Sequence, residues 1–251
     1  SSPVISWTGP GTYSSSDQNP TISPASAGNS GTYMVTVQGD GGCTSAQSQV
    51  TVTVNPKPTL STTASDVTCN GDNNGSASVT ATGNGTMTYS WSPSGGNAAT
   101  ATGLSSGTYT VTVTDGNNCE NTATVVIAEP TALSVSTSTT QSGCAASTGS
   151  ATATPTGGNG GYTYSWNDIT NQTTQTASNL AAGTYTVTVT DSKGCSITAN
   201  AIVTNSSGPI VTIASQQNVD CSAQNTGSAT VNVTGGTGSY TYTWDPNVST
   251  S

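Results

Sequence analysis

Cysteines and carboxylates are the side chains in this sequence with the greatest capacity for chemistry, since it has six cysteines, eleven acids, no histidine and only two cationic residues. Nucleophilic triads of the Ser–His–Asp or Cys–His type need an imidazole, so the chain cannot assemble one from its own residues. Eleven acids would suffice for the carboxylate pair of a glycosidase. They fall in predicted linkers and turns, however, which favours solvated positions. The sequence therefore predicts no enzyme and no cofactor.

Metal sites are weakly indicated. Zinc is disfavoured because the chain has no C-x-x-C pair and no histidine. Asp72 with Asn70 and Asn73, or Asp115 with Glu120, could offer oxygen ligands to calcium. Asx residues in these positions are also typical of turns, which is the favoured interpretation.

The cysteines lie within a repeat. The segment SSGTYTVTVTDGNNC ends at Cys119. A close copy, AAGTYTVTVTDSKGC, ends 76 residues later at Cys195. A weaker copy ends at Cys43, 76 residues before Cys119. A second marker, TYSW or TYTW, ends at Trp91, Trp166 and Trp244. Such a fixed period is typical of a tandem array of small modules.

Short proline-containing segments divide the array at 55–58, 128–130 and 206–209, because proline ends a strand and stiffens a linker. The predicted domains are an immunoglobulin-like domain at 1–56, N-terminally incomplete, repeat modules at 57–130 and 131–208, and a partial module at 209–251. Because the last unit stops after Trp244 and residue 1 is serine, we expect a mature or partial chain. The last unit could also be completed by another chain.

An all-β fold is expected, specifically a tandem array of small Ig-like antiparallel β-sandwiches. The chain holds 51 threonines and 38 serines, and its segments alternate apolar and polar residues with period two. About six or seven short strands per module, separated by turns, indicate a sandwich. Tyr109 and Tyr185 resemble the tyrosine corner of Greek-key sandwiches, and Trp91 and Trp166 are expected to plug the core.

Disulfides in an oxidising, extracellular setting are the favoured state of the cysteines. Two pairings fit the spacings. The first lies within modules, Cys69–Cys119 and Cys144–Cys195, and leaves Cys43 and Cys221 with partners outside this sequence. The second crosses the linkers, Cys43–Cys69, Cys119–Cys144 and Cys195–Cys221. The first is preferred, because four antiparallel strands between two turns would bring both turns to one end of the sandwich. An additional strand would defeat that argument.

Composition excludes two classes of partner. Nucleic-acid binding requires clustered cations, and the chain has two cationic residues and a formal charge of −9. Docking to an anionic membrane is excluded for the same reason. No apolar run approaches the length of a membrane span, so insertion is not expected.

The runs CNGDNNGSASVTATGNG, TYSW and GLSSGTYTVTVTDGNNC, and their copies through Cys195, resemble the SprB-type repeat. The resemblance covers about 57–251, and 1–56 resembles the Ig-like modules found beside such repeats. Such repeats occur in tandem in large cell-surface adhesins of gliding bacteria that use type IX secretion. The resemblance implies an extracellular stalk or filament that contacts surfaces or polysaccharide, with no catalytic residue.

Two further hypotheses concern partners. The chain could instead be a carbohydrate-binding accessory region of a secreted enzyme, with Tyr13, Tyr162 or Tyr240 as an exposed aromatic platform. Rows of outward threonines and few charged residues at strand edges also suggest lateral or end-to-end self-association.

Overall fold

The protein is described by a computed structural model that covers residues 2–144, 146–219, 227–236 and 238–244. The chain divides into two compact units, Ser1–Glu129 and Pro130–Ser251. Every regular element within the described ranges is a β-strand, apart from one 3-10 turn, Ala27–Asn29. The fold is therefore all-β, as predicted. No helix in those ranges has the length and hydropathy of a bilayer-crossing segment.

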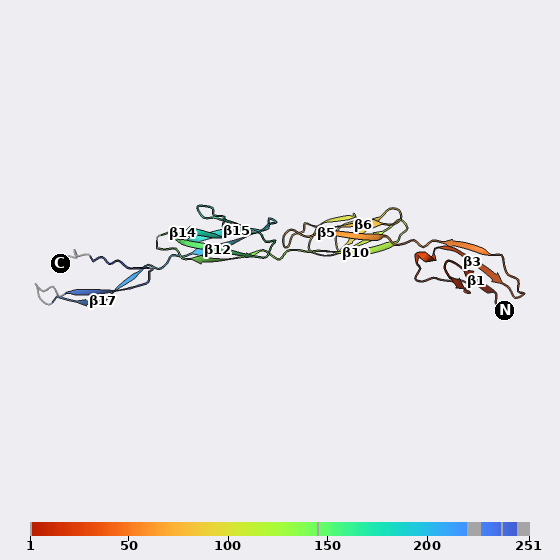
Figure 1. The fold of residues 1–251 in the computed structure, drawn as a ribbon, viewed down its shortest axis with the longest axis horizontal. Helices are drawn as coiled ribbons and strands as arrows, with labels where there is room; N and C mark the ends of the chain where they lie inside the picture. Colours follow the sequence, from red (N-terminus) through yellow and green to blue (C-terminus); the bar gives the residue numbers. More distant parts are fainter. Residues whose placement is uncertain (1, 145, 220–226, 237, 245–251) are drawn as a thin grey trace. The chain divides into compact units, whose positions relative to one another are not determined.

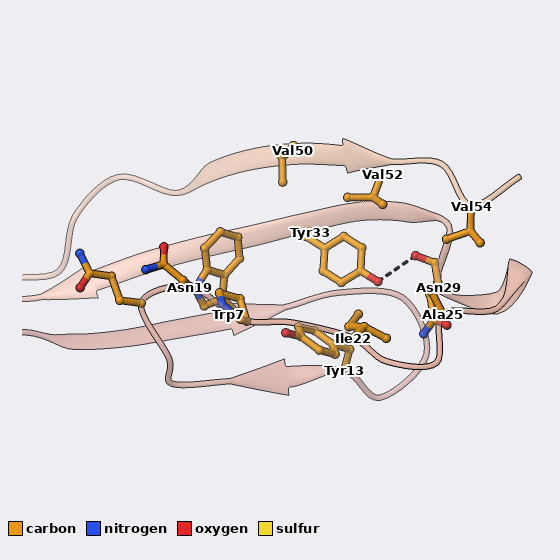
Figure 2. A pocket seen from close by; sticks show the side chains of 12 residues that line it. Trp7, Tyr13, Asn19, Ile22, Ala25, Asn29, Tyr33, Val50, Val52 and Val54 are labelled. Atoms are coloured by element: carbon orange, nitrogen blue, oxygen red, sulfur yellow. Dashed lines mark hydrogen bonds between the residues drawn. The ribbon is translucent and has the colours of Figure 1, made fainter. Parts of the chain in front are cut away.

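The first module is a four-stranded antiparallel sheet in the order β2-β1-β3-β4. Its strands are β1 (Val4–Thr8), β2 (Ser14–Ser15), β3 (Gly31–Gln38) and β4 (Ser48–Val52). The register pairs Trp7 with Val35 and Tyr33 with Val50, so these side chains share one apolar face. The segment between β2 and β3 passes over that face (Figure 2).

The second module is a sandwich of two three-stranded sheets, β5-β6-β8 and β10-β9-β7 (Figure 1). Its strands are β5 (Thr59–Ser65), β6 (Gly75–Thr82), β7 (Thr88–Ser92), β8 (Thr100–Leu104), β9 (Gly107–Thr114) and β10 (Glu120–Ile127). All pairings are antiparallel.

The third module repeats this topology with sheets β11-β12-β14 and β13-β15-β16. Its strands are β11 (Ser134–Thr140), β12 (Gly149–Thr156), β13 (Thr163–Trp166), β14 (Thr176–Leu180), β15 (Gly183–Thr190) and β16 (Ser196–Val203). Beyond it, β17 (Ile210–Gln217) and β18 (Ser228–Thr234) form a two-stranded sheet whose Ile210 and Ile213 are exposed.

Period-two alternation builds thin cores in the second and third modules. Along β9, Tyr109, Val111 and Val113 are buried, and the threonines between them lie on the other face. Many of the remaining inward residues are alanine, such as Ala151 and Ala153 in β12. Small inward side chains bring the two sheets close together but remove little apolar surface from water.

One pass of the chain through each sandwich changes sheet at its midpoint. In the second module β7 pairs with the second half of β9, from Ser92↔Thr110 to Thr88↔Thr114, whereas β8 pairs with the first half of β6. The two short strands therefore run one after the other in the same direction, in opposite sheets. β13 and β14 do the same in the third module.

The tryptophans that recur in the repeat hold this sheet change in place. Trp91 is buried, and its indole Nε1–H donates to the carbonyl oxygen of Ala98 at 2.9 Å, in the segment that crosses between the sheets. Trp166 makes the equivalent bond to Thr174 at 3.0 Å. Gly95, at φ +130°, is required beside the first ring, because a Cβ there would lie 2.9 Å from the Cβ of Trp91.

Tyrosine corners occur in all three described modules. The hydroxyls of Tyr33, Tyr109 and Tyr185 each donate to a backbone carbonyl four residues upstream, at 2.8, 3.1 and 3.0 Å. Tyr33 and Tyr109 are buried, whereas Tyr185 is half-buried against its core cluster. Each bond ties the start of a central strand to the turn before it.

Replacing Trp166 by alanine should remove most of the stability of the third module. Trp166 is 1% exposed, and truncation of a buried tryptophan costs about 3–5 kcal/mol. Trp244 occupies the same place in the repeat but is 58% exposed, so Trp244→Ala is the matched control. When urea unfolding is followed by near-ultraviolet circular dichroism, the urea concentration at the midpoint should fall for Trp166→Ala and stay at the wild-type value for Trp244→Ala. Equal midpoints in both variants would contradict the core role of Trp166.

Candidate functional site

The turns that carry Cys119 and Cys195 are built around a buried aspartate. Asp191 Oδ1 accepts the backbone N–H groups of Lys193 at 2.9 Å and Cys195 at 3.0 Å. Its Oδ2 accepts the backbone N–H of Asn159 at 2.8 Å and the side-chain amide of the same residue at 3.0 Å. The carboxylate thus fastens two loops at one end of the third module.

Asp115 has the same role in the second module. Its Oδ1 accepts the N–H groups of Asn117 and Cys119, each at 2.9 Å, and its Oδ2 accepts the N–H of Asn84 at 3.4 Å. In the first module Gly39 takes the equivalent position. Its backbone N–H donates to the carbonyl of Cys43, as those of Asp115 and Asp191 do to Cys119 and Cys195, but glycine has no carboxylate to hold the turn.

Hydrogen bonding keeps these carboxylates ionised. Burial raises the pKa of Asp191, but the bonds from Asn159, Lys193 and Cys195 outweigh it and bring the pKa to about 2. The N–H of Cys119 is the main cause that lowers the pKa of Asp115, with burial opposing it. Both groups therefore serve as anionic acceptors for backbone N–H groups and are not poised to transfer protons near neutral pH.

The two cysteine turns of each module lie at opposite ends of it. We call the end where the chain enters a module its proximal end and the end where it leaves its distal end. Cys119 is proximal, because its thiol donates to the carbonyl of Asn55, in the preceding linker, at 3.7 Å. Cys69 is distal, since its turn donates the N–H of Gly71 to Glu129 Oε2, in the following linker, at 2.9 Å. Eight residues of extended strand separate such ends.

The third module has the same arrangement. Cys144 is distal, and its thiol donates to the carbonyl of Ser206 at 3.3 Å. Cys195 is proximal, and Asn159 Nδ2 donates to its sulfur at 3.6 Å. Asn159 lies next to Gly158, whose N–H donates to Thr131 in the preceding linker at 2.9 Å.

The within-module pairings Cys69–Cys119 and Cys144–Cys195 are therefore wrong. Cys119 and Cys144 carry free thiols, whereas Cys69 and Cys195 are disulfide-bonded. The physical reason is the sheet change. β7 and β8 together make one crossing of the sandwich, so three passes and not four separate the turns.

Pairing across linkers does not occur either for Cys43–Cys69 or Cys119–Cys144, because Cys43, Cys119 and Cys144 are all free thiols. The third predicted pairing across a linker, Cys195–Cys221, includes Cys221, which lies outside the described residues.

Residues of both candidate calcium positions take part in turn hydrogen bonds, the interpretation that the sequence favoured. Asp72 Oδ2 accepts the amide of Asn74 at 3.3 Å, and Glu120 Oε1 accepts the hydroxyl of Thr114 at 3.3 Å. Across the described ranges, no group of three or more Cys, Asp or Glu side chains is arranged to hold a metal ion.

A groove of about 490 Å³ lies on the first module. Trp7 and Tyr33 line it from the sheet, Tyr13 and Ile22 line it from the segments on either side of β2, and Val50 and Val52 of β4 border it together with Val54 just beyond that strand (Figure 2). The rings of Tyr13 and Tyr33 meet edge to face, with centroids 5.2 Å apart. Gln18 and Asn19 add amide groups at one end. The groove is thus apolar and aromatic, with neutral hydrogen-bonding groups at its rim.

The other two candidate platform residues are placed differently. Tyr162 is half-buried against the core of the third module and donates its hydroxyl to Gly157 at 2.6 Å. Tyr240 is 40% exposed and donates to Gly235. The structure therefore brings only Tyr13, among the three, into a groove with other aromatic side chains.

Sequence reasoning missed the aspartate anchors. Asp168 is a third example: burial raises its pKa, but bonds from Thr170 and Gln172 lower it to about 2. The available signal was an aspartate four residues before a cysteine in two copies of the repeat, Asp115 and Asp191.

The SprB repeat family model matches the sequence three times, at residues 61–96, 136–171 and 213–249. The chain carries SprB repeats. The first two matches run from the first strand of the second and third modules to just beyond the tryptophan, through the strands that precede the sheet change. No curated protein sequence matches the chain.

Several solved structures of Ig-domain arrays are similar to this chain. The N-terminal eight Ig domains of Down Syndrome Cell Adhesion Molecule isoform 1.30.30 share 16% identity, with a TM-score of 0.35, over 84% of this chain and 33% of that one. Titin domains I67–I69 share 11% identity, with a TM-score of 0.33, over 81% of this chain and 88% of the titin chain. Drosophila OTK extracellular domains 3–5 share 15% sequence identity, with a TM-score of 0.26, over 80% of this chain and 85% of the OTK chain. The chain spans about a third of the first of these structures.

Replacing Asp191 by asparagine should destabilise the SprB module in a pH-dependent way. The folded-state pKa of about 2 lies below the unfolded value, so ionisation stabilises the fold above about pH 4. That contribution is lost as the pH falls through 2. The melting temperature of Asp191→Asn should therefore be lower than that of the wild type at pH 7, and the two should converge near pH 2.

The exposed Glu120→Gln variant is the control, and its melting temperature should follow the wild type throughout. A constant difference between Asp191→Asn and the wild type from pH 7 to pH 2 would show that charge is not the cause.

Proposed function

We propose that this chain is part of an extracellular structural and adhesive array at a bacterial cell surface, where its modules form a stalk or filament that contacts surfaces or polysaccharide. The repeated module carries this proposal: the second and third modules have the same topology, the same tryptophan and tyrosine positions and the same aspartate turns. SprB repeats occur in cell-surface proteins, and a role in adhesion or gliding motility follows from that resemblance.

The side-chain chemistry supports a structural role over a catalytic one. The carboxylates with lowered pKa values, Asp115, Asp168 and Asp191, accept hydrogen bonds from their own turns, and Asp115 and Asp191 also accept them from a neighbouring loop. A general acid or base needs a pKa near the working pH and access to substrate, and these groups have neither. Disulfides at Cys69 and Cys195 further support an oxidising, extracellular location.

The adhesive role is tested by coating beads with the full chain and measuring their retention under flow on glass, cellulose and other polysaccharide films. Retention should exceed that of beads coated with serum albumin at equal density. It should fall when the modules are unfolded by the Trp166→Ala substitution, because adhesion requires the folded faces. Retention equal to albumin on every surface would contradict adhesion.

A second candidate is a carbohydrate-binding accessory module, which the groove on the first module favours. Sugars stack their apolar faces on aromatic rings and bond their hydroxyls to neutral amides. Tyr13 and Trp7, with Gln18 and Asn19, supply both kinds of group. The groove has no charged lining residue, so a neutral glycan is the matching ligand class.

Replacing Tyr13 by alanine should weaken neutral-glycan binding on a glycan array by roughly tenfold. Stacking on one aromatic ring is worth about 1–3 kcal/mol for a nucleic-acid base, and the low end of that range, applied to a sugar face, corresponds to this factor. Tyr240→Ala, which removes an exposed tyrosine outside the groove, should leave binding unchanged. The accessory-module candidate is excluded if the wild-type chain binds no glycan, or if both variants bind as the wild type does.

A further inference from the structure

Four asparagines in this chain are followed directly by glycine. Such an asparagine is prone to lose ammonia spontaneously, because glycine has no side chain to hinder attack of its backbone nitrogen on the asparagine Cγ. The attack requires that no hydrogen bond holds the side-chain amide or the glycine N–H. All four asparagines are exposed, so solvent access does not distinguish them. The pairs are Asn70–Gly71, Asn74–Gly75, Asn84–Gly85 and Asn159–Gly160.

Hydrogen bonds hold the side chain of Asn159 in the third module. Its Nδ2 donates to Asp191 Oδ2 at 3.0 Å and to the sulfur of Cys195 at 3.6 Å. Both bonds must break before the amide can turn toward Gly160 and leave as ammonia. Hydrogen bonds to ionised partners are among the stronger ones in proteins, so this asparagine is protected.

Asn74 and Asn70 in the second module are held in two different ways. The Nδ2 of Asn74 donates to Asp72 Oδ2 at 3.3 Å, and its Oδ1 accepts a backbone N–H at 2.9 Å. For Asn70 the attacking group is held, because the N–H of Gly71 donates to Glu129 Oε2 at 2.9 Å. That bond fixes the plane of the peptide group, so the nitrogen cannot turn toward the Asn70 side chain.

Asn84 is the exception. Within the described residues, neither its side-chain amide nor the N–H of Gly85 makes a hydrogen bond. The carbonyl oxygen of Asn84 accepts the N–H of Gly116 at 2.7 Å. When the nitrogen of Gly85 gives up its proton, the negative charge is shared with that oxygen through the peptide bond. The hydrogen bond from Gly116 therefore stabilises the attacking anion, as a donor in an oxyanion hole does.

We propose that Asn84 is a site of spontaneous deamidation in the folded chain, where it converts to aspartate and isoaspartate while the other three asparagines stay amides. The repeat provides a matched comparison. Asn84 lies seven residues before Trp91, and Asn159 lies seven residues before Trp166 (91 − 84 and 166 − 159). Position in the module and the glycine that follows are the same, so the hydrogen bonds make the difference.

The reaction needs water alone. The nitrogen of Gly85 loses its proton to a solvent base and bonds to Cγ of Asn84. The bond from Cγ to Nδ2 breaks, and Nδ2 leaves as ammonia with a proton from solvent. The resulting five-membered imide then adds one water molecule. Opening at the side-chain carbonyl gives aspartate, and opening at the main-chain carbonyl gives isoaspartate, so no oxidant or reductant takes part.

The product changes the loop that Asp115 fastens. The backbone N–H of Asn84 donates to Asp115 Oδ2 at 3.4 Å, so a carboxylate at position 84 adds a like charge beside Asp115. Isoaspartate also routes the main chain through Cβ, which displaces the carbonyl that accepts the N–H of Gly116. Both effects act at the proximal end of the second module.

Peptide mapping of the aged chain tests the proposal. The folded full chain is kept in mildly alkaline buffer, digested with pepsin at acidic pH, where deamidation is slow, and analysed by tandem mass spectrometry. Asn84 should show the mass change from NH2 to OH at a rate at least about tenfold above that of Asn159, whose bond to an ionised carboxylate must break first. Asn70 and Asn74 should also lag behind Asn84. Conversion of Asn84 no faster than that of the other three would overturn the proposal.

Unfolding separates the effect of structure from that of local sequence. In concentrated urea all four asparagines should convert at similar rates, since the protecting hydrogen bonds are lost. If Asn84 stayed as far ahead of the others in urea as in the folded chain, the hydrogen bonds would not be the cause.

Matched variants assign the reaction to Asn84. Asn84→Gln should abolish the early mass gain of the intact chain, because glutamine must close a larger ring, whereas Asn159→Gln should keep it. An early gain that persists in Asn84→Gln, or disappears in Asn159→Gln, would overturn the assignment. The wild-type peptide map decides the matter even if one variant fails to fold.

Discussion

The midpoint sheet change is the constraint on which the rest of each SprB module depends. Because β7 and β8, or β13 and β14, share a single crossing, three passes of the chain separate the two cysteine turns, and the turns lie at opposite ends. The crossing needs a large ring to fill the space between the sheets and a hydrogen bond to hold the connecting segment. Trp91 and Trp166 supply the ring, and their indole N–H groups donate the hydrogen bond. A module built this way cannot close an internal disulfide between its two cysteines, so its own packing must maintain its fold.

That packing buries little apolar surface and includes many local hydrogen bonds. Small domains bury a limited share of their surface and commonly rely on additional constraints. Here the constraints are polar. Tyr109 and Tyr185 tie a central strand to the preceding turn, and Asp115 and Asp191 tie the cysteine turn to a neighbouring loop.

Much of the fold could be predicted from the sequence, because it rests on local periodicity. The alternation in GTYTVTVT placed Tyr109, Val111 and Val113 on one buried face, and the spacing of the repeat placed the tryptophans in equivalent positions. The disulfide pairing could not be predicted, since it depends on the number of passes between two turns. From the sequence, TYSW and the segment after it look like two separate passes through the sandwich. Only the pairing register of the two strands shows that they make one crossing together. The groove on the first module depends on how the segment after β2 folds over the sheet, which no local pattern encodes.

The central claim is that each SprB module is maintained by its own core, without a disulfide between its two cysteines. Hydrogen–deuterium exchange at the amides of Val111, Val113, Val187 and Val189 tests this most directly, when the native chain is compared with and without a reductant. The account predicts the same slow exchange at all four amides in both conditions. Loss of protection at these amides on reduction would contradict it, because the core would then depend on a disulfide.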